Sequence, residues 1–542
     1  MSFPYDIWGL TKEQVVSIST AIAATGLGLY TLYSVTCGPS YAKEARKRGL
    51  IAVPEAKGAL PYVGHLFSLG KAPAVRVTEW ASELQSPIVR IRMGVKPWMM
   101  ICDQQLAHDL FVTHGSITSH RPHQVYSHKF YSLEERGIII PPPGKRWKKS
   151  RAAALTVLAP KHVERFSEII KSEADYIVEH LMADTKRSGQ VEPFKPLQSA
   201  TMNVVLMVCL GMRVPSAHDP FFKEIIDVVD RGIKYCGADN DMSAFLPILS
   251  ALDILVRKER TLKQYIDTER NPLFRRLIQH GLEGDKDCFV KSLYALKDEY
   301  DLDEDGILVM MNDMLAAGSD TIAVTLAWNV AILCHYPEVQ AKMQREIDEF
   351  VSVHRRYPTY NESEQFPYIV SVQKECMRYR PTSPFGLLHM AAEDFECRGY
   401  FIPKGTTLVS NMHAMHLNPE IFPDPHKFIP ERYMWNNRPM SALANTKIET
   451  RDQYNFGWGR RMCPGIHLAE VEMFEIYIRL FSRCKIEPAL NEKGEKVYPD
   501  LSKGRYGGLV LLPEHYQVRF VQRSDVPSFY ENCMSRKQST FY

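Results

Sequence analysis

The feature that most constrains this 542-residue chain is a glycine-rich loop that carries one cysteine. Residues 456–465 read Phe-Gly-Trp-Gly-Arg-Arg-Met-Cys-Pro-Gly, and an apolar run with helical periodicity follows at residues 466–481. Glycines let backbone N–H groups approach the sulfur of Cys463, while the start of the next helix and the arginines add positive potential. Because all three effects favour thiolate over thiol, the loop suggests a metal ligand or a nucleophile, although a lone cysteine in such a loop is more often neither.

The same segment resembles the haem-binding loop of the cytochrome P450 family, Phe-Gly-x-Gly-x-Arg-x-Cys-x-Gly, at every defined position. The resemblance implies that Cys463 is the axial thiolate of haem b (iron protoporphyrin IX), a ligand that favours O–O cleavage. It also implies that Arg461 binds a haem propionate and that Phe456 packs on the thiolate side of the haem. Three glycines are expected to let the backbone approach the porphyrin: Gly457, Gly459 and Gly465.

A pair of opposite charges lies upstream of this loop. Glu375 and Arg378 are three residues apart, so they share one face of a predicted helix. Alone, that spacing indicates only a surface ion pair of small energy. In the family, such a pair joins the arginine of a Pro-Glu-Arg-aromatic motif, which here is Arg432 in residues 430–433. The resemblance therefore implies a buried network of three charges behind the haem loop.

A long helical pattern, from about residue 304 to residue 335, carries small and polar residues on one face. Met314, Ala317, Thr321 and Thr325 recur at three- and four-residue spacing, where a core helix usually has large apolar side chains. Small residues open a groove along a helix. Taken by itself, however, the segment also fits a buried helix with a glycine packing contact.

Residues 316–321, Ala-Ala-Gly-Ser-Asp-Thr, resemble the oxygen-binding helix of the family, Ala-Gly-x-Asp-Thr-Thr/Ser. On this resemblance Ala317 lies against the haem, Thr321 hydrogen-bonds dioxygen and Asp320 helps to deliver protons from solvent. Ile322 departs from the pattern, which has Thr or Ser there, and the departure can alter either the proton relay or the substrate pocket.

Further haem contacts are implied by a Trp-x-x-x-Arg segment and by a histidine. Trp147 and Arg151 share a helix face, and both are expected to bind haem propionates, as is His389. A plain loop histidine remains an equal alternative for His389. The substrate pocket is expected to be apolar, which suits steroid-like or terpenoid substrates among others. Its predicted lining residues are Phe385, Leu387, Leu388, Leu509 and Val510.

The front of the chain reads as a membrane anchor. No charged residue occurs at positions 14–42, and residues 15–33 are about long enough to cross a bilayer as a helix. A basic group at residues 43–48 follows, which places the remainder on the cytoplasmic side of the endoplasmic reticulum membrane. An interfacial helix or a signal peptide is the alternative. We expect an anchor at 1–36, a basic and Pro/Gly connector at 37–65, and a haem-thiolate catalytic domain at 66–542.

Electrons have to come from another protein, because the chain has no room for a fused flavin domain and no GxGxxG segment after a strand. Resemblance to anchored, cytosol-facing members of the family implies NADPH–cytochrome P450 reductase, with cytochrome b5 as a further candidate. The basic residues of the segment 145–151 are the predicted docking surface. The formal net charge of +3 gives no indication of nucleic acid binding, and none of the 11 cysteines forms a CxxC pair.

The resemblance covers the chain after the anchor and implies a mainly α fold with a small β-rich region and the haem between helices. Its Phe-Gly-Trp-Gly and Ala-Gly-Ser-Asp-Thr variants resemble those of fungal members. The leading hypothesis is a monooxygenase that inserts one oxygen atom of O2 into an apolar substrate. A haem-thiolate isomerase or peroxygenase is the second hypothesis, and a non-catalytic membrane haem protein is the third. The acid–alcohol pair, Asp320 with Thr321, favours the first.

Overall fold

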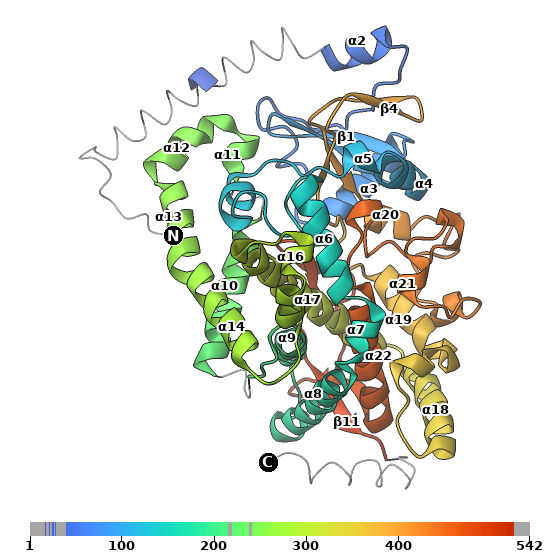
Figure 1. Ribbon diagram of the computed structural model, residues 1–542. Coiled ribbons are helices and arrows are strands. Elements are labelled where there is room, and N and C mark those ends of the chain that lie inside the picture. The colour runs from blue at the N-terminus through green and yellow to red at the C-terminus, as the bar shows by residue number, and fades with distance from the viewer. Residues whose placement is uncertain are drawn as a thin grey trace.

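The computed structural model describes residues 40–214, 219–237 and 241–524, with a few isolated positions between 17 and 28 (Figure 1). The predicted anchor at residues 1–36 lies outside the described residues except for those positions, so it stays a prediction. The helix α2, Ser40–Lys47, contains most of the basic group that follows the predicted anchor.

The organising element is α17, Glu304–Cys334, which runs through the middle of the molecule (Figure 1). Asp303 caps its first turn, because the Asp303 carboxylate accepts a hydrogen bond from the backbone N–H of Gly306 at 2.7 Å. Among the described residues α17 is the one helix long and apolar enough to cross a membrane, but 78% of its apolar window is buried inside the protein. It is therefore a core helix, as the sequence predicted.

Three long helices surround α17: α8 (Ser167–Ser188), α9 (Phe194–Leu210) and α22 (Ile466–Arg483). Apolar side chains of α8, α17 and α22 meet in one buried cluster. Ile322 and Ile466 both belong to this cluster. Consequently the α17 segment just before Ile322 and the cysteine loop just before Ile466 border the same part of the core.

The β structure is small and, among the described residues, is divided among four sheets, with β1 and β4 at one end of the molecule and β11 at the other (Figure 1). A four-stranded sheet has the order β1-β2-β6-β3, with β1 and β2 antiparallel, β2 and β6 parallel, and β3 and β6 antiparallel. Its strands are β1 (Ile88–Met93), β2 (Lys96–Ile101), β3 (His389–Met390) and β6 (Thr407–Ser410). The smaller sheets contain β4 (Phe395–Cys397), β5 (Tyr400–Ile402), β7 (Cys484–Leu490), β8 (Lys496–Val497), β9 (Gly504–Gly507), β10 (Val510–Pro513) and β11 (Val518–Gln522).

The remaining helices cover this frame, and several begin with proline, whose fixed φ suits a first helical turn. They are α3 (Pro73–Glu83), α4 (Gln104–His108), α5 (Gly115–Thr118), α6 (Lys145–Val157), α7 (Pro160–Glu164), α10 (Pro220–Tyr235), α11 (Met242–Phe245), α12 (Ser250–Leu255), α13 (Lys258–Tyr265), α14 (Asn271–Glu283), α15 (Phe289–Ala295), α16 (Lys297–Tyr300), α18 (Pro337–His354), α19 (Pro367–Tyr379), α20 (Met412–His416) and α21 (Met440–Leu443). Three π-helical segments, η1 (Asp109–Thr113), η2 (Tyr126–Tyr131) and η5 (Ile266–Arg270), interrupt this pattern. Short 3-10 helices are η4 (Pro247–Leu249), η6 (Tyr360–Gln365), η7 (Pro430–Tyr433), η8 (Ile448–Thr450) and η9 (Gly459–Arg461).

The predicted fold class, mainly α with a small β-rich region, is confirmed. The helix predicted at residues 304–335 is α17, and the run predicted at 466–481 begins α22 and extends to Arg483.

Candidate functional site

The cysteine loop reverses direction sharply before α22. Gly457 and Gly459 have φ angles of +79° and +48°, a region that side-chain-bearing residues rarely adopt. A Cβ at Gly459 would lie 2.6 Å from the carbonyl oxygen of Phe111, so only glycine fits there. The Cys463 N–H donates to the carbonyl of Phe456 at 2.9 Å, which closes the loop. The glycines thus set the backbone that presents the cysteine.

Cys463 has an exposed side chain, although Arg461, Met462 and Ile466 around it are buried. Desolvation raises the pKa of its thiol, and the N–H of Gly465 and the charge of Arg151 only partly offset that rise. Binding to a metal ion would itself deprotonate the thiol.

Three arginines from distant parts of the chain gather beside this loop: Arg121, Arg151 and Arg461. Burial, and then repulsion from the neighbouring arginines, lowers the pKa of Arg121 to about 9 and that of Arg461 to about 8. No carboxylate of the described residues forms an ion pair with any of the three. Arg121 was missed by the sequence argument, since nothing in residues 117–122 distinguishes it.

Arg461 is held by backbone carbonyls rather than by acids. It donates to the carbonyl oxygens of Ser119 at 2.9 Å and Ile138 at 3.2 Å, and also to that of Pro141. Its guanidinium lies 4.2 Å from the ring centroid of Trp147, whose indole N–H donates to Ile138 as well, at 3.0 Å. Two of the five guanidinium N–H groups remain for an anionic ligand.

Arg151 and His389 complete the surroundings of the loop. Arg151, on the same α6 face as Trp147, donates to the carbonyl of Met462, directly before the cysteine. His389 is buried; its Nδ1 lies 2.9 Å from the Thr118 carbonyl and its ring 4.5 Å from that of Phe111. Burial, and then the charges of Arg121 and Arg461, hold the pKa of His389 well below its usual range. The predicted propionate ligands therefore lie together around Cys463.

The three charged residues predicted to form a network lie together, with Arg378 and Arg432 both within ion-pair distance of Glu375. Glu375 and Arg378 are fully buried in α19, and the Nε of Arg378 lies 2.7 Å from the Glu375 carboxylate. Arg432, from η7, approaches the same carboxylate at 3.1 Å. The backbone N–H of Ile429 adds a fourth donor at 2.9 Å. One carboxylate thus fixes α19 to the segment before the cysteine loop.

The middle of α17 is less buried than the rest of the helix, and this part carries the small residues at 316–318. Ala317 is exposed and residues 316, 318, 320 and 321 are only half-buried, whereas the rest of this helix from Gly306 onward is buried. The Thr321 hydroxyl donates to the Ala317 carbonyl at 2.7 Å, so its oxygen can still accept a hydrogen bond. Ile322 points into the buried core, away from the uncovered segment, so it does not line a pocket there.

Asp320 faces α9 and takes part in a chain of polar groups that the sequence did not predict. The Lys195 ammonium donates to the Gln198 side-chain oxygen at 3.1 Å, and the Gln198 amide donates to Asp320 at 2.9 Å. Lys195 is exposed and Gln198 is buried, so the chain runs from the surface to α17. Burial raises the pKa of Asp320, while Gln198 and Lys195 lower it in part.

The predicted pocket segments come together next to α17. The Thr325 and Thr382 hydroxyls lie 2.6 Å apart, and Ser383 donates to the Leu509 carbonyl at 2.8 Å. Leu387 and Leu509 are exposed, Phe385 and Leu388 pack against a neighbouring apolar cluster, and Val510 is buried against Trp328. The side chains available to an apolar ligand are therefore chiefly Leu387 and Leu509.

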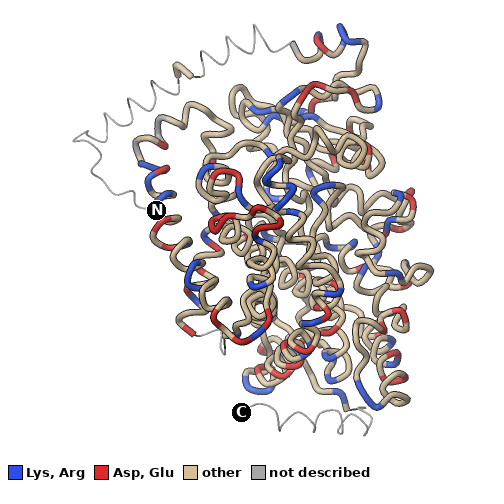
Figure 2. The backbone as a smooth tube through the Cα atoms, viewed as in Figure 1, with Lys and Arg blue, Asp and Glu red and all other residues tan. Residues whose placement is uncertain are grey.

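The basic stretch on α6 lies beside an acidic turn (Figure 2). Lys149 forms an ion pair with Asp301 at 2.9 Å, and Lys145 and Arg146 also lower the pKa of that carboxyl. Lys148 is exposed. Asp301 therefore offsets part of the positive charge of the segment 145–151, which was the predicted docking surface.

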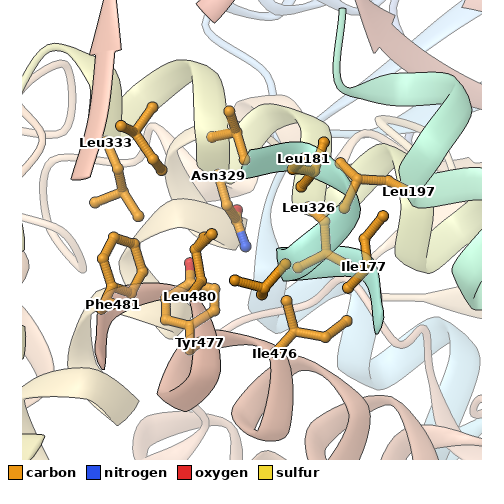
Figure 3. A pocket seen from close by; sticks show the side chains of 13 residues that line it. Ile177, Leu181, Leu197, Leu326, Asn329, Leu333, Ile476, Tyr477, Leu480 and Phe481 are labelled. Atoms are coloured by element: carbon orange, nitrogen blue, oxygen red, sulfur yellow. The ribbon is translucent and has the colours of Figure 1, made fainter. Parts of the chain in front are cut away.

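An apolar cavity lies on the other side of α17, between α8, α9 and α22 (Figure 3). It is bordered by Leu181, Leu326, Tyr477 and Phe481 among others, and Asn329 points toward it. None of the residues predicted for the functional site lines it, so it is separate from the cysteine loop.

The residues around Cys463 fit haem. An exposed cysteine, an uncovered helix segment of small residues and three buried arginines without carboxylate partners suit a flat apolar group that carries a metal and two carboxylates. Cys463 would hold the iron, Ala317 would face the ring, and Arg121, Arg151 and Arg461 would hold the propionates.

Comparisons with known proteins agree with this arrangement. A family model described as Cytochrome P450 matches residues 54–520. The 3-hydroxyphenylacetate 6-hydroxylase of Emericella nidulans is 26% identical over 485 residues, which cover 88% of this chain and 91% of the relative. Cytochrome P450 monooxygenase yanC of Aspergillus niger is 26% identical over 530 residues, covering 93% of this chain and 94% of the relative.

Solved structures show the same fold. A zebra fish cytochrome P450 with abiraterone superposes with a TM-score of 0.68 at 25% identity, over 83% of this chain and 100% of that one. A second zebra fish structure, with progesterone, has the same TM-score at 24% identity, over 83% and 99% of the two chains.

Proposed function

This chain belongs to the cytochrome P450 family and is a haem-thiolate monooxygenase, and from that premise we propose its substrate class, its electron supply and the roles of its residues. The observation that carries the assignment of residues is the gathering of Arg121, Arg151 and Arg461 around Cys463 without a carboxylate partner among the described residues. The isomerase or peroxygenase and the non-catalytic haem protein are disfavoured, because the relatives named above are hydroxylases and monooxygenases.

Haem bound through a thiolate supplies the activation of O2, for which electron donation from sulfur favours O–O cleavage. The protein's part begins with Cys463, which the Gly457 and Gly459 turns hold at the start of α22. Arg461 and Arg151 supply fixed positive charge on this side of the site. Because their own hydrogen bonds go to backbone carbonyls, they do not have to break an ion pair to bind an anion.

Proton delivery is assigned to Thr321 and Asp320. Thr321 already donates to Ala317, so its hydroxyl oxygen is an acceptor oriented by the helix itself. Gln198, itself held by Lys195, positions the Asp320 carboxylate on the α9 side of α17, where Asp320 would exchange protons with solvent. The raised pKa of Asp320 suits a group that gives and takes a proton.

The substrate is proposed to be apolar, with a steroid-like or terpenoid skeleton favoured. Leu387 and Leu509 offer apolar surface next to the uncovered segment of α17, and Phe385 and Leu388 lie behind them. The 3-hydroxyphenylacetate 6-hydroxylase relative makes aromatic acids the alternative class.

Electrons are proposed to come from NADPH through a separate reductase, with cytochrome b5 as a second donor. The protein would sit at the endoplasmic reticulum membrane through residues 1–36, with its catalytic part facing the cytoplasm. The exposed Lys148 and its neighbours on α6 would meet the acidic surface of the donor. The Asp301 turn beside them offsets part of the positive charge of Lys149.

A reconstitution experiment tests this proposal. Full-length protein in vesicles, with NADPH and a cytochrome P450 reductase, is offered a panel of steroids, terpenoids and phenylacetates under isotopically labelled O2. Incorporation of one labelled oxygen atom into a steroid or terpenoid supports the proposed class. Oxidation of phenylacetates alone would replace it with aromatic acids, and turnover without added reductase would refute the proposed electron supply.

A further inference from the structure

A second buried ion pair lies beside the Glu375 network and involves the preceding residue. Lys374 in α19 is fully buried, and its ammonium lies 3.0 Å from the carboxylate of Asp452, which is also buried. The same ammonium donates to the carbonyl oxygens of Asn436 at 3.1 Å and Arg438 at 2.7 Å. Lys374 thus has two carbonyl acceptors and one ion-pair partner, all from the chain that leads toward the cysteine loop.

Asp452 lies only a few residues before the cysteine loop. Its neighbour Arg451 donates to the carbonyl of Gly457 at 2.6 Å, and the Arg451 guanidinium lies 4.4 Å from the ring centroid of Trp458. On the other side, the amide of Asn455 donates to the Met377 carbonyl of α19 at 3.0 Å. The segment 451–458 is therefore tied to α19 through Asn455, and its two ends are tied to each other through Arg451 and the turn at Gly457.

The two buried networks hold different segments. Glu375 binds Ile429 and Arg432, which lie before residue 434. Lys374 binds residues 436 and 438 and the carboxylate at 452. Since a buried lysine without an acid partner is strongly unfavourable, the position of Asp452 is fixed by charge as well as by packing.

We propose that Lys374 and Asp452, with Arg451, are positioning residues that hold the cysteine loop in the geometry required for thiolate ligation of haem. The inference rests on the proposed role of Cys463. Groups that orient a metal ligand from behind typically change metal affinity about 10- to 100-fold when they are removed. The ion pair acts on Cys463 indirectly. It fixes Asp452, and the backbone next to Asp452 is held by the hydrogen bonds of Arg451 and Asn455.

The test uses haem-loaded full-length protein with Lys374→Met or Asp452→Asn. Lys342→Met is the matched control, because Lys342 forms an exposed ion pair with Glu431 at 2.6 Å, with side chains 46% and 49% exposed. Two properties are measured on folded protein, as judged by circular dichroism. They are the fraction of the reduced carbon monoxide complex with the strongly red-shifted Soret band, and the rate of haem transfer to an acceptor protein.

We expect both pair variants to lose most of the red-shifted band and to release haem about 10-fold faster or more, while Lys342→Met matches wild type. Folded Lys374→Met and Asp452→Asn with wild-type bands and haem release would overturn the positioning role. Failure of both pair variants to fold would overturn it too, since the pair would then support the whole fold. A wild type without the red-shifted band would instead refute the Cys463 assignment.

Discussion

Glu375→Gln is expected to destabilise the protein strongly, although glutamine has almost the same shape. In the wild type the two carboxylate oxygens accept four N–H groups: two from Arg378 at 2.7 and 2.8 Å, one from Arg432 at 3.1 Å and one from Ile429 at 2.9 Å. Glutamine keeps one oxygen and turns an NH2 group toward donors. Two guanidinium groups then remain buried without the negative charge that compensates them.

Removing one member of such a buried ion pair costs about 3–5 kcal/mol. Since 1.4 kcal/mol corresponds to about a factor of ten, the unfolded fraction should rise by roughly two to three orders of magnitude or more. The measurement is urea unfolding followed by circular dichroism, for wild type and Glu375→Gln. Glu431→Gln, in an exposed pair, serves as the control and should change stability by less than about 1 kcal/mol.

A Glu375→Gln protein within about 1 kcal/mol of wild type would refute this reasoning. It would mean that the buried charges are compensated elsewhere and that the carboxylate is not the centre of the network.

Three further predictions follow from the site and its surroundings. Gln198→Leu should increase the share of reductase-delivered electrons released as hydrogen peroxide, because Asp320 loses the hydrogen bond that positions it for proton delivery; peroxide formed per NADPH consumed measures this, and an unchanged ratio would exclude that positioning role. Lys148→Gln combined with Lys149→Gln should slow reduction by the reductase and flatten its salt dependence in stopped-flow traces, whereas an unchanged rate would remove the docking surface. Asp313 is buried in α17, where it accepts hydrogen bonds from the Tyr131 hydroxyl at 2.9 Å and the Ile138 N–H at 2.7 Å. Burial raises its pKa to about 6, so the folded state holds this proton more tightly than the unfolded state and stability is lost as pH rises from about 4 through 6. Relative to Asp313→Asn, the wild type should therefore lose about 1–1.5 kcal/mol of unfolding free energy between about pH 5 and pH 7.5, as measured by urea titrations. Parallel pH profiles of the two proteins would contradict the raised pKa of Asp313.

The sequence predicted the parts of this protein whose chemistry demands particular residues at fixed spacing. Gly457 and Gly459 adopt positive φ and Glu375 faces Arg378, because turn geometry and helix periodicity depend only on local sequence. The ends of α17 and the start of α22 were predictable for the same reason.

Contacts made across the fold were not predictable from spacing. Arg121 reaches the cysteine loop, and Gln198 reaches Asp320, from segments that carry no motif. The exposure of Cys463 beside the buried residues Arg461 and Met462 was not predictable either, because it depends on how distant segments pack around the loop. Ile322, which departs from the family pattern, proved to face the core, a direction that depends on how α17 packs against its neighbours.

The central claim is that Cys463 is the thiolate ligand of a haem. The most direct measurement is the carbon monoxide difference spectrum of the reduced, haem-loaded protein, for wild type and Cys463→Ala. The account predicts a strongly red-shifted Soret band in the wild type that disappears in the variant. A folded, haem-loaded wild type without that band, or a variant that keeps it, would contradict the thiolate assignment.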